Sequence, residues 1–431
     1  MSTARPALSG DARRVLAAQA LRAFAYGLGA VLLGTTLEAR GFGPNKAGMV
    51  LAAVVAGTIG ATVAVARWSD RVGRRRSYVA LYVALAGAGA VFALSGNVVA
   101  LVLVGLTGTL STDIIDNGPF TSLEQAMLAT DLAGTERIRG FGLYNAVATA
   151  AGSLGALAAG GPELLRRHIR ALPVDQRFFL LFVPVALAGA IVAWSLSPGV
   201  EAPLAAAPSP PWAGLGRSRP TVVRLSALFA TDAFGGGFVV QAFIAYWFAA
   251  RFHTSVGVLG VVFFVVGILQ TASFLVATAL AERFGLLSTM VFTHLPSNLL
   301  LAAIGFAPNL ATGLALLLVR SALSSMDVPT RQAYVMGLVD PAERTAAAGY
   351  TNTARYLARP VGPALAGAGQ GLFVGLPFVL AGGIKAAYDL VLWRWFRNVR
   401  LPDDAVADGL GRAERPRAAA PPAVVGGGES T

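Results

Sequence analysis

Apolar stretches long enough to cross a lipid bilayer recur along nearly the whole of this chain. A membrane-spanning helix needs about 20 predominantly apolar residues, and such stretches follow one another here with short polar connections between them. The composition agrees, because 55% of the residues are hydrophobic and 13% are charged, whereas soluble domains carry roughly 25% charged residues. We therefore predict an all-α polytopic membrane protein.

The apolar pattern predicts twelve transmembrane helices in two groups of six. The first group lies at Val15–Leu37, Ala47–Arg67, Ser77–Leu94, Val98–Ala129, Gly140–Leu165 and Phe178–Ser197. The second group lies at Val222–Ala250, Val256–Ala281, Leu286–Phe306, Leu310–Leu338, Arg344–Gly371 and Leu376–Phe396. Pro, Ala and Gly are frequent between the groups, which is typical of a linker. The predicted organisation is an N-terminal segment (1–12), a six-helix bundle (13–197), a linker (198–220), a second six-helix bundle (221–400) and a disordered tail (401–431).

The formal net charge of +12 would suggest nucleic-acid binding in a soluble protein. Here the basic residues gather at the ends of the apolar stretches, so membrane orientation explains them and we expect no nucleic-acid partner. The chain has no cysteine, and its histidines His168, His253 and His294 are scattered along it. We therefore expect no disulfide, no metal site and no cofactor. No cleaved signal is expected either, because the first apolar stretch has full spanning length.

Arginines at the helix ends predict the orientation in the membrane. They precede the first predicted helix and follow the last, at Arg13, Arg14, Arg394, Arg397 and Arg400. Because short loops rich in Lys and Arg stay in the cytoplasm, both termini and the linker are expected there, in a cytoplasmic (inner) membrane. The fifth connection is expected outside but is also basic, with Arg166, Arg167, His168, Arg170 and Arg177. Either this exception is tolerated, or the loop forms an electropositive mouth that gathers anions.

The two halves of the chain share a sequence pattern. Glu124-Gln125-Ala126 followed by Glu136-Arg137 corresponds, at the same spacing, to Arg331-Gln332-Ala333 followed by Glu343-Arg344. The same offset matches Gly142, Asn145, Gly155 and Gly160 to Gly349, Asn352, Gly362 and Gly367. A weaker echo links Asp70-Arg71-x-Gly73 to Glu282-Arg283-x-Gly285. Repeats of this length are typical of secondary transporters, in which the central site lies between two parallel bundles.

The loop between the second and third predicted helices carries the most distinctive motif. Residues 66–76 contain five arginines and one acid. With six plus six helices, the run Asp70-Arg71-x-Gly73-Arg74-Arg75 resembles the signature loop of the major facilitator superfamily, although Ala66 stands where that family has its first Gly. The resemblance implies that Asp70 attracts the N-terminus of the eleventh helix. It also implies a conformational latch that favours the outward-open state, formed by Asp70, Arg71, Gly73, Arg74 and Arg75.

A second family motif is only partly present. Exporters of this superfamily carry Gly-Pro-x-x-x-Gly on the fifth helix. The corresponding run in the fifth predicted helix here, Gly152 to Gly160, contains no proline. The proline stands instead in the eleventh helix, in the run Gly362-Pro363-x-x-x-Gly367. This departure weakens the assignment to a drug-exporter-like branch, and close packing of small residues would explain both runs equally well.

Ionisable residues within the predicted helices are candidates for function, because a charge at membrane depth is costly. Asp113, Asn117 and Glu124 share a stripe on the fourth helix, and Asp327 pairs at i, i+4 with Arg331 on the tenth. In this family, helices one, four, seven and ten line the cavity. The resemblance and the stripes together predict a substrate pathway formed by Arg22, Asp113, Asp116, Asn117, Glu124, Asp232, Gln241, Asp327, Arg331, Asn352, Arg355 and Arg359.

Roles within this pathway follow from charge and spacing. Asp113, Asp116 and Asp232 are predicted to couple transport to protons. Asp113 and Asp116 have no basic residue nearby on their own helix, and an acid buried without a cation can take up a proton near neutral pH. Glu124 and Arg331 occupy equivalent repeat positions with opposite charge, so we expect them to form a gate pair near the cytoplasmic end. The alternative is that these charged residues form static pairs that serve packing.

The sequence as a whole predicts a secondary active transporter that moves a small solute outward by alternating access, coupled to protons. The alternative within this class is a transporter of a polar organic anion, which Arg22, Arg331, Arg355 and Arg359 would bind. A non-transporting sensor or scaffold is the alternative outside it, and the retained intramembrane acids argue against that. No catalytic spacing or phosphate-binding loop is present, so we expect no enzyme activity. The expected partners are the solute, protons and lipid, and the expected state is a monomer.

Overall fold

The structure is a computed structural model that describes residues 9–113, 118–131, 134–166, 169, 175–201, 215–340 and 343–399. These residues form seventeen α-helices and two 3-10 helices, and none of them lies in a β-strand. Ten helical segments of this described part are long and apolar enough to cross a membrane. The prediction of an all-helical, multi-pass membrane protein is confirmed at this level.

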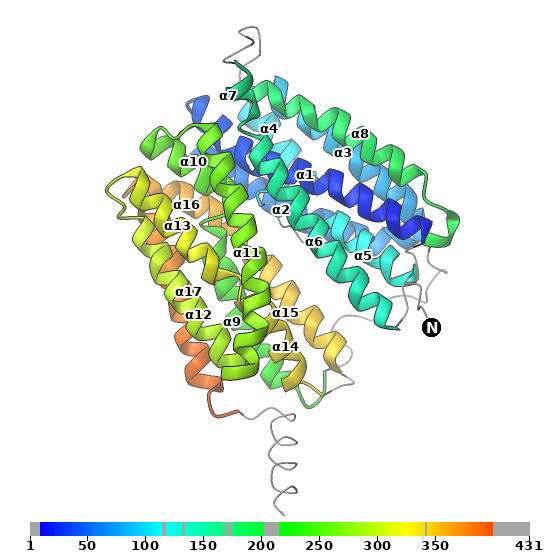
Figure 1. Ribbon diagram of the computed structural model, residues 1–431, viewed down its shortest axis with the longest axis vertical. Coiled ribbons are helices and arrows are strands. Elements are labelled where there is room, and N and C mark those ends of the chain that lie inside the picture. The colour runs from blue at the N-terminus through cyan, green and yellow to red at the C-terminus, as the bar shows by residue number, and fades with distance from the viewer. Residues whose placement is uncertain are drawn as a thin grey trace, which may run out of the picture.

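The helices divide into two halves that lie side by side (Figure 1). The N-terminal half contains α1 Gly10–Ala39, α2 Pro44–Val72, α3 Arg74–Leu94, α4 Val98–Gly105, α5 Pro119–Asp131, α6 Gly134–Ala158, α7 Gly161–Arg166, η1 Asp175–Leu181, α8 Phe182–Trp194 and η2 Pro198–Val200. The C-terminal half contains α9 Arg219–Gly237, α10 Gln241–Phe252, α11 Val256–Phe284, α12 Leu286–Ile304, α13 Leu310–Ser324, α14 Asp327–Leu338, α15 Arg344–Ala358, α16 Val361–Gln370 and α17 Leu376–Phe396.

Several helices begin at polar residues that cap their first turn. The side chains of these residues accept a hydrogen bond from a backbone N–H group that has no partner inside the helix. The capping residues are Ser9 before α1, Asn97 before α4, Ser255 before α11 and Asn309 before α13. The starts of these apolar helices are therefore set by single polar residues in the connections.

Two of the twelve predicted spans, each formed by two shorter helices, are absent from the ten long segments. Within 98–129, α4 ends at Gly105 and α5 begins at Pro119; Gly108 between them has a φ of +70°, which glycine adopts without steric cost. Within 344–371, α15 ends before Pro360, because proline lacks the N–H group and its ring clashes with the preceding turn. These interruptions put irregular backbone next to charged residues.

The two halves pack tightly against each other at one end of the molecule. There α1 contacts α10, α2 contacts α16, and α6 contacts α11. The backbones approach closely because the contact residues are glycines: a Cβ added to Gly48 of α2 would lie 2.5 Å from the carbonyl oxygen of Pro363. The Tyr246 hydroxyl also donates to the carbonyl oxygen of Phe42 across the junction, at 2.9 Å. At the opposite end, α5 and α6 lie apart from α14 and α15 (Figure 1).

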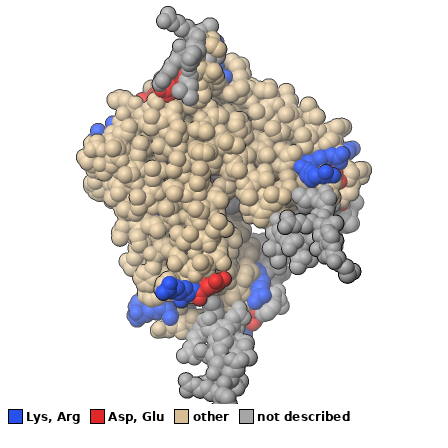
Figure 2. All heavy atoms as spheres, in the orientation of Figure 1, with Lys and Arg blue, Asp and Glu red and all other residues tan. Residues whose placement is uncertain are grey.

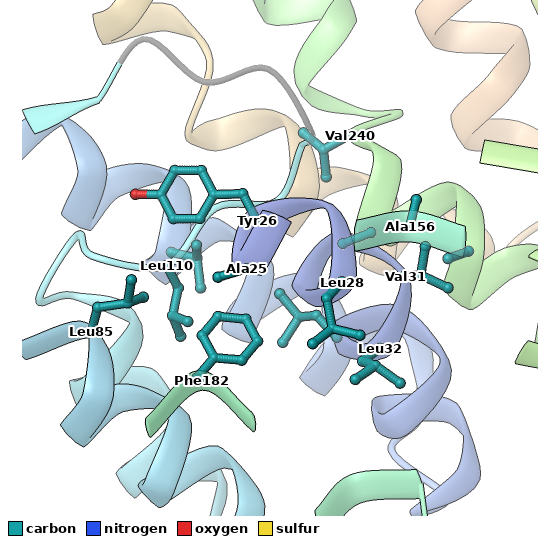
Figure 3. Packing of buried hydrophobic residues seen from close by; sticks show 14 of the residues in the cluster. Ala25, Tyr26, Leu28, Val31, Leu32, Leu85, Leu110, Ala156, Phe182 and Val240 are labelled. Carbon is teal, nitrogen blue, oxygen red and sulfur yellow. The ribbon is translucent and has the colours of Figure 1, made fainter. Parts of the chain in front are cut away.

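The largest buried apolar cluster surrounds α1 and joins the two halves. Figure 3 shows Tyr26, Leu28 and Val31 of α1 among residues such as Phe182 of α8 and Val240 of the C-terminal half. A second cluster belongs to the C-terminal half alone and includes Val222, Phe229, Met290 and Tyr388. The two halves therefore share a buried apolar core only at the end where they pack tightly against each other.

The outer surface matches a protein embedded in lipid. Figure 2 shows a face made almost entirely of uncharged residues, with Lys, Arg, Asp and Glu gathered near the ends of the helices. Large apolar side chains such as Leu94, Ile191 and Leu275 are exposed on it. This many exposed apolar side chains indicates a surface that faces acyl chains rather than water.

Candidate functional site

Five charged side chains from four helices form a buried group, which we call the C-terminal cluster: Asp232 of α9, Asp327 and Arg331 of α14, Arg355 of α15 and Lys385 of α17. Asp232 is only 3% exposed. Its Oδ1 accepts a hydrogen bond from Lys385 Nζ, and its Oδ2 lies 3.1 Å from Arg355 Nη1. Gly235 allows this approach, because a Cβ there would lie 2.8 Å from Lys385 Cγ.

Arg331 connects the two acids of the C-terminal cluster. Its Nη1 lies 2.5 Å from Asp327 Oδ2 and 3.8 Å from Asp232 Oδ2. The predicted i, i+4 pair of Asp327 and Arg331 therefore forms. One carboxylate, Asp232, is surrounded by three cations, and the most exposed of these is Arg355, whose side chain is 26% accessible. The C-terminal cluster is therefore accessible from outside at Arg355.

Beside the C-terminal cluster lies a buried group that we call the His294 triad: His294 and Asn298 of α12 and Asp389 of α17. His294 Nδ1 lies 2.8 Å from Asp389 Oδ1, and Asn298 Nδ2 donates to Asp389 Oδ2 at 2.8 Å. The other ring nitrogen, Nε2, lies 3.9 Å from Asp232 Oδ1. The imidazole ring therefore stands between two carboxylates that belong to different helices.

Among the residues that the structure describes in the N-terminal half there is one buried ion pair, in which Arg22 of α1 binds Glu124 of α5. Arg22 Nε and Nη2 donate to the two carboxylate oxygens at 2.9 and 2.7 Å. The Tyr78 and Tyr144 hydroxyls donate to the same carboxylate at 2.8 and 2.6 Å. Four donors from α1, α3 and α6 thus saturate a carboxylate that has no solvent exposure, as a buried charge requires.

The expected gate pair of Glu124 and Arg331 does not form in this structure. Glu124 binds Arg22, and Arg331 binds Asp327, so each has its partner within its own half. The repeat makes the difference plain, because the offset that relates Glu124 to Arg331 relates Arg22 to Phe229. The Arg331 guanidinium lies 5.6 Å from the centre of the Phe229 ring. The two halves thus keep the same positions next to each other, but the neighbours are Arg22 and Glu124 in one half and Phe229 and Arg331 in the other.

Asp113 lies at the junction of the two halves, between α4 and α5. Its carboxylate forms an ion pair with Arg359, which follows α15, and accepts a hydrogen bond from the backbone N–H of Gln241 at 3.0 Å. Gln241 is the first residue of α10, so the carboxylate also lies at the positive end of a helix. Because α4 has ended before Asp113, this residue does not share a helical stripe with Glu124, contrary to the prediction.

A pocket of about 290 Å³ lies beside the Asp113–Arg359 pair. Its walls come from α2, from the segment after α4 and from α15. Hydroxyl groups of Thr58, Thr62 and Tyr356 alternate there with apolar side chains such as Val63 and Leu357. Val63 and Leu357 are 61% and 66% exposed, so the pocket opens at the surface between α2 and α15.

The arginine-rich loop does not contact the eleventh predicted helix in this structure. Asp70 pairs within its own half with Arg74, Oδ1 to Nε at 3.0 Å, and is 43% exposed. The N-terminus of α3 is instead bound by Glu201, which accepts from the backbone N–H groups of Arg74 and Arg75 at 2.6 and 3.3 Å. The halves are apart at this end, so the carboxylate has no helix across the junction to reach.

A second glutamate ties the C-terminal half in a similar way. Glu343, directly before α15, accepts from the backbone N–H groups of Gly216, Arg217 and Ser218, which precede α9. Desolvation raises the pKa of Glu343, but these hydrogen bonds outweigh it and hold the pKa below its ordinary value. The start of α9 is therefore anchored to the start of α15.

The remaining predicted residues divide into two groups. Asp116 and Asn117, and the basic residues Arg167, His168 and Arg170, lie outside the described residues. Gln241 takes part through its backbone, whereas its side-chain Nε2 is buried without a hydrogen-bond partner. Asn352 is exposed on α15.

Sequence reasoning missed three ionisable residues of the C-terminal half. His294 is one of three histidines that are scattered along the sequence and form no ligand pattern. Lys385 and Asp389 lie on the twelfth predicted helix, which is not among those expected to line the pathway. A signal was present, because Lys385 and Asp389 stand at i, i+4 within an apolar stretch and both are costly at membrane depth. Tyr78 and Tyr144 carried no such signal, since an isolated tyrosine in an apolar helix is ordinary.

Comparison with known proteins agrees with this architecture. A protein of Saccharomyces cerevisiae described as the uncharacterized membrane protein YJR124C is 26% identical over 425 residues, which cover 91% of this chain and 95% of the yeast protein. The nucleoside transporter NupG superposes with a TM-score of 0.69 at 15% identity, over 90% of this chain and 98% of its own. A D-xylose-proton symporter superposes with a TM-score of 0.67 at 14% identity, over 89% and 98%.

The profile of the Major Facilitator Superfamily matches residues 15–363, which is most of the chain. It matches the superfamily as a whole, so the drug-exporter-like branch stays a prediction. The chain therefore belongs to the Major Facilitator Superfamily and is a membrane transporter rather than an enzyme.

Proposed function

We propose that this protein is a proton-coupled secondary transporter of a small organic solute, with export from the cytoplasm as its direction. The observation that carries the proposal is the C-terminal cluster together with the His294 triad, in which ionisable groups of five helices are buried within membrane-spanning segments. Burying so many charges is costly, and such residues in membrane proteins mark ion and substrate pathways. The resemblance to exporters is the ground for the direction.

The proposed mechanism is alternating access between two halves of six spans each. The divided pairs α4–α5 and α15–α16 would supply the two spans missing from the ten long segments. If the termini are cytoplasmic, the end at which the halves are apart faces the cytoplasm and the conformation is inward-facing. The Arg74–Asp70 loop would then engage α15 only after the halves close at that end, which agrees with a latch that favours the outward-open state.

Proton coupling is supported by the way the acids are held. Asp232 is bound by cations from other helices, and Asp113 is bound by Arg359 across the junction of the halves. A carboxylate that exchanges a cation for a proton changes which helices it holds together, so protonation can be linked to movement. One protein of similar fold is described as a D-xylose-proton symporter, and another as a nucleoside transporter.

A polar organic anion is the second candidate for the solute. Arg355 of α15 and Arg359, which directly follows that helix, are four residues apart, and their side chains are 26% and 34% exposed. Both are held by aspartates, Asp232 and Asp113, which a carboxylate or phosphate could replace, and guanidinium groups bind such anions through two hydrogen bonds. With an anion, a bound proton would offset its charge and favour transport of both in the same direction.

The solute would be sought by ligand stabilisation of the purified protein, screening nucleosides, pentoses, organic cations and organic anions, because a ligand of the folded state raises its melting temperature. Proteoliposomes would then test solutes that stabilise it, with a pH gradient of either sign. We expect accumulation that depends on the gradient and is lost in Asp232→Asn, whereas Asp340→Asn at an exposed position keeps it.

The outcome that contradicts proton coupling is accumulation that persists after an ionophore has collapsed the pH gradient. The direction of the pH gradient that drives accumulation of the solute distinguishes export from import. Arg355→Gln separates the two solute classes, because it should abolish transport of an anion and leave transport of a neutral or cationic solute partly intact.

A further inference from the structure

The His294 triad differs from the other buried charges in how its acid is neutralised. Asp389 has no solvent exposure, and its hydrogen-bond partners are His294 Nδ1 and Asn298 Nδ2. The other buried carboxylates, Glu124, Asp232 and Asp327, each bind an arginine or a lysine directly. Asp389 is therefore the buried acid whose direct charged partner exists only when a histidine carries a proton.

Charge balance allows that proton to come and go. With His294 neutral, the three acids Asp232, Asp327 and Asp389 balance the three cations Arg331, Arg355 and Lys385. With His294 protonated, the contact with Asp389 becomes an ion pair and the group carries one surplus positive charge. An isolated charge in a low-dielectric interior would make a protonation state of His294 too costly. Neither the neutral nor the protonated state contains such a charge.

The contacts of the two ring nitrogens differ. The Nδ1 atom of His294 donates to Asp389 when that carboxyl is ionised, and Asn298 Nδ2 holds the second carboxylate oxygen and also lies 3.1 Å from Nδ1. The Nε2 atom is then the free position, and it points toward Asp232 Oδ1 at 3.9 Å. Asp232 in turn binds Arg355, the cluster residue with the most exposed side chain. Asp232 thus lies between His294 and the exposed side of the cluster.

Four helices near His294 contribute charged or titratable groups to this arrangement. These groups are Asp389, Lys385 and Tyr388 of α17, Asp232 of α9, Asp327 and Arg331 of α14, and Arg355 of α15. Helix α13 contacts α12 through the Arg320 carbonyl oxygen, which accepts from the Ser297 hydroxyl at 3.1 Å. The charges of α11, Glu282 and Arg283, lie in its last turn at the end of the helix.

We propose that His294 is the proton-binding group of the C-terminal half. Its Nε2 takes up a proton from the pathway by way of Asp232 and releases it by the same route, while Asp389 and Asn298 hold the Nδ1 side of the ring. This inference rests on the proposed proton coupling and names the residue at which the proton binds. A proton at Nε2 donates toward Asp232 and so weakens the hold of that carboxylate on Arg355, which connects α9 to α15.

The test is to observe the histidine rings directly. The full-length protein, labelled with 13C and 15N in histidine and held in lipid nanodiscs, would be titrated from pH 5 to 9 by NMR. The chain has three histidines, and His294→Gln identifies the signal. We expect His294 to titrate within this range and to carry its proton on Nδ1 when neutral. The exposed His253 provides an internal reference signal.

A His294 signal that stays in one protonation state from pH 5 to 9, or that is neutral with its proton on Nε2, overturns the proposal. Asp389→Asn should move the midpoint of His294 to lower pH by about 1–3 units, because it removes an opposite charge in direct contact. Glu282→Gln, which removes an exposed carboxylate from α11, should leave the midpoint unchanged. Equal effects of the two variants would also overturn it.

A transport measurement separates this inference from the proposed function. In proteoliposomes, His294→Gln should lose accumulation driven by a pH gradient but keep exchange of labelled for unlabelled solute. Gradient-driven accumulation that persists in His294→Gln excludes His294 and leaves proton coupling standing. If the unaltered protein shows no gradient-driven accumulation, the proposed coupling fails, and the NMR titration still decides whether His294 binds a proton.

Discussion

At the scale of single residues, the buried carboxylates of Glu124, Asp232 and Asp389 are held by side chains from helices other than their own. Glu124 of α5 receives donors from α1, α3 and α6, and Asp232 of α9 receives them from α15 and α17. A lone charge at such a position would be costly to bury, so these groups act as crosslinks between helices. Removing one partner costs more than removing both, because it leaves the other charge without compensation.

This leads to a prediction for the Arg22–Glu124 pair. Arg22→Met keeps an apolar side chain against Tyr26 and Phe120 but leaves Glu124 without its cation, and should destabilise the protein by about 3–5 kcal/mol. Reversible unfolding in detergent with a chemical denaturant measures the loss. The double variant Arg22→Met with Glu124→Leu should recover most of it.

The matched control for Arg22 is the same substitution at an exposed pair. Arg14 pairs with Asp11 and its side chain is 46% exposed, so Arg14→Met should change the free energy of unfolding by less than about 1 kcal/mol. If the two arginine variants lose the same stability, burial is not what gives the Arg22 pair its importance.

At the scale of helices, glycines decide where the two halves can touch. Gly48 and Gly367 bring α2 and α16 into backbone contact, and a Cβ on Gly367 would lie 2.3 Å from the carbonyl oxygen of Pro44. Within the N-terminal half, Gly152 and Gly155 of α6 likewise come into backbone contact with α1. Small residues allow such close packing in membrane proteins, so the glycines of the fifth and eleventh predicted helices have a packing role here.

We predict that Gly48→Val lowers the population of the conformation described here, because the added side chain collides with α16 where the halves are closed. The chain has no cysteine, so spin labels can be placed at the exposed positions Trp68 of α2 and Phe284 of α11. Pulsed electron resonance would then show a second, different distance between these labels. Gly60→Val on the same helix meets no atom within 4 Å and should leave the distribution unchanged; a similar shift in both variants would refute a role for the Gly48 contact.

At the scale of the whole molecule, the junction of the halves is close-packed, and Asp113 meets Arg359 and the start of α10 there. This pair spans the two halves, so its strength contributes to the balance between conformations rather than to the stability of either half alone. The pocket beside it has polar and apolar walls from both halves, and its shape must therefore change whenever the halves move.

We predict that Asp113→Asn and Arg359→Gln each shift the same label distances, and that the double variant shifts them by less than the sum. Coupling energies of contacting residues are about 0.5–3 kcal/mol, which is enough to change the ratio of two conformations several-fold. Asp11→Asn with Arg14→Gln, a pair within one half, serves as the control and should leave the distances unchanged. Additive shifts from Asp113 and Arg359 would mean that the two residues act separately.

The sequence by itself determined the helices, their order and the class of protein. A membrane helix satisfies its own backbone hydrogen bonds, so an apolar stretch of sufficient length specifies it locally. The repeat and the Asp70-Arg71-x-Gly73 loop likewise predicted the superfamily that the profile comparison confirms. The break at Pro360 is local too, because it follows from proline's own geometry.

Only the tertiary structure decided which charge meets which. Spacing along a helix finds pairs such as Asp327 and Arg331, but it says nothing about neighbours on other helices. Glu124 was expected to meet Arg331 and binds Arg22; Asp70 was expected at the eleventh helix and binds Arg74. His294, Lys385 and Asp389 entered the site because α12 and α17 pack against each other. Electrostatic partners depend on distance in space, and in this protein that distance is set by how the helices pack.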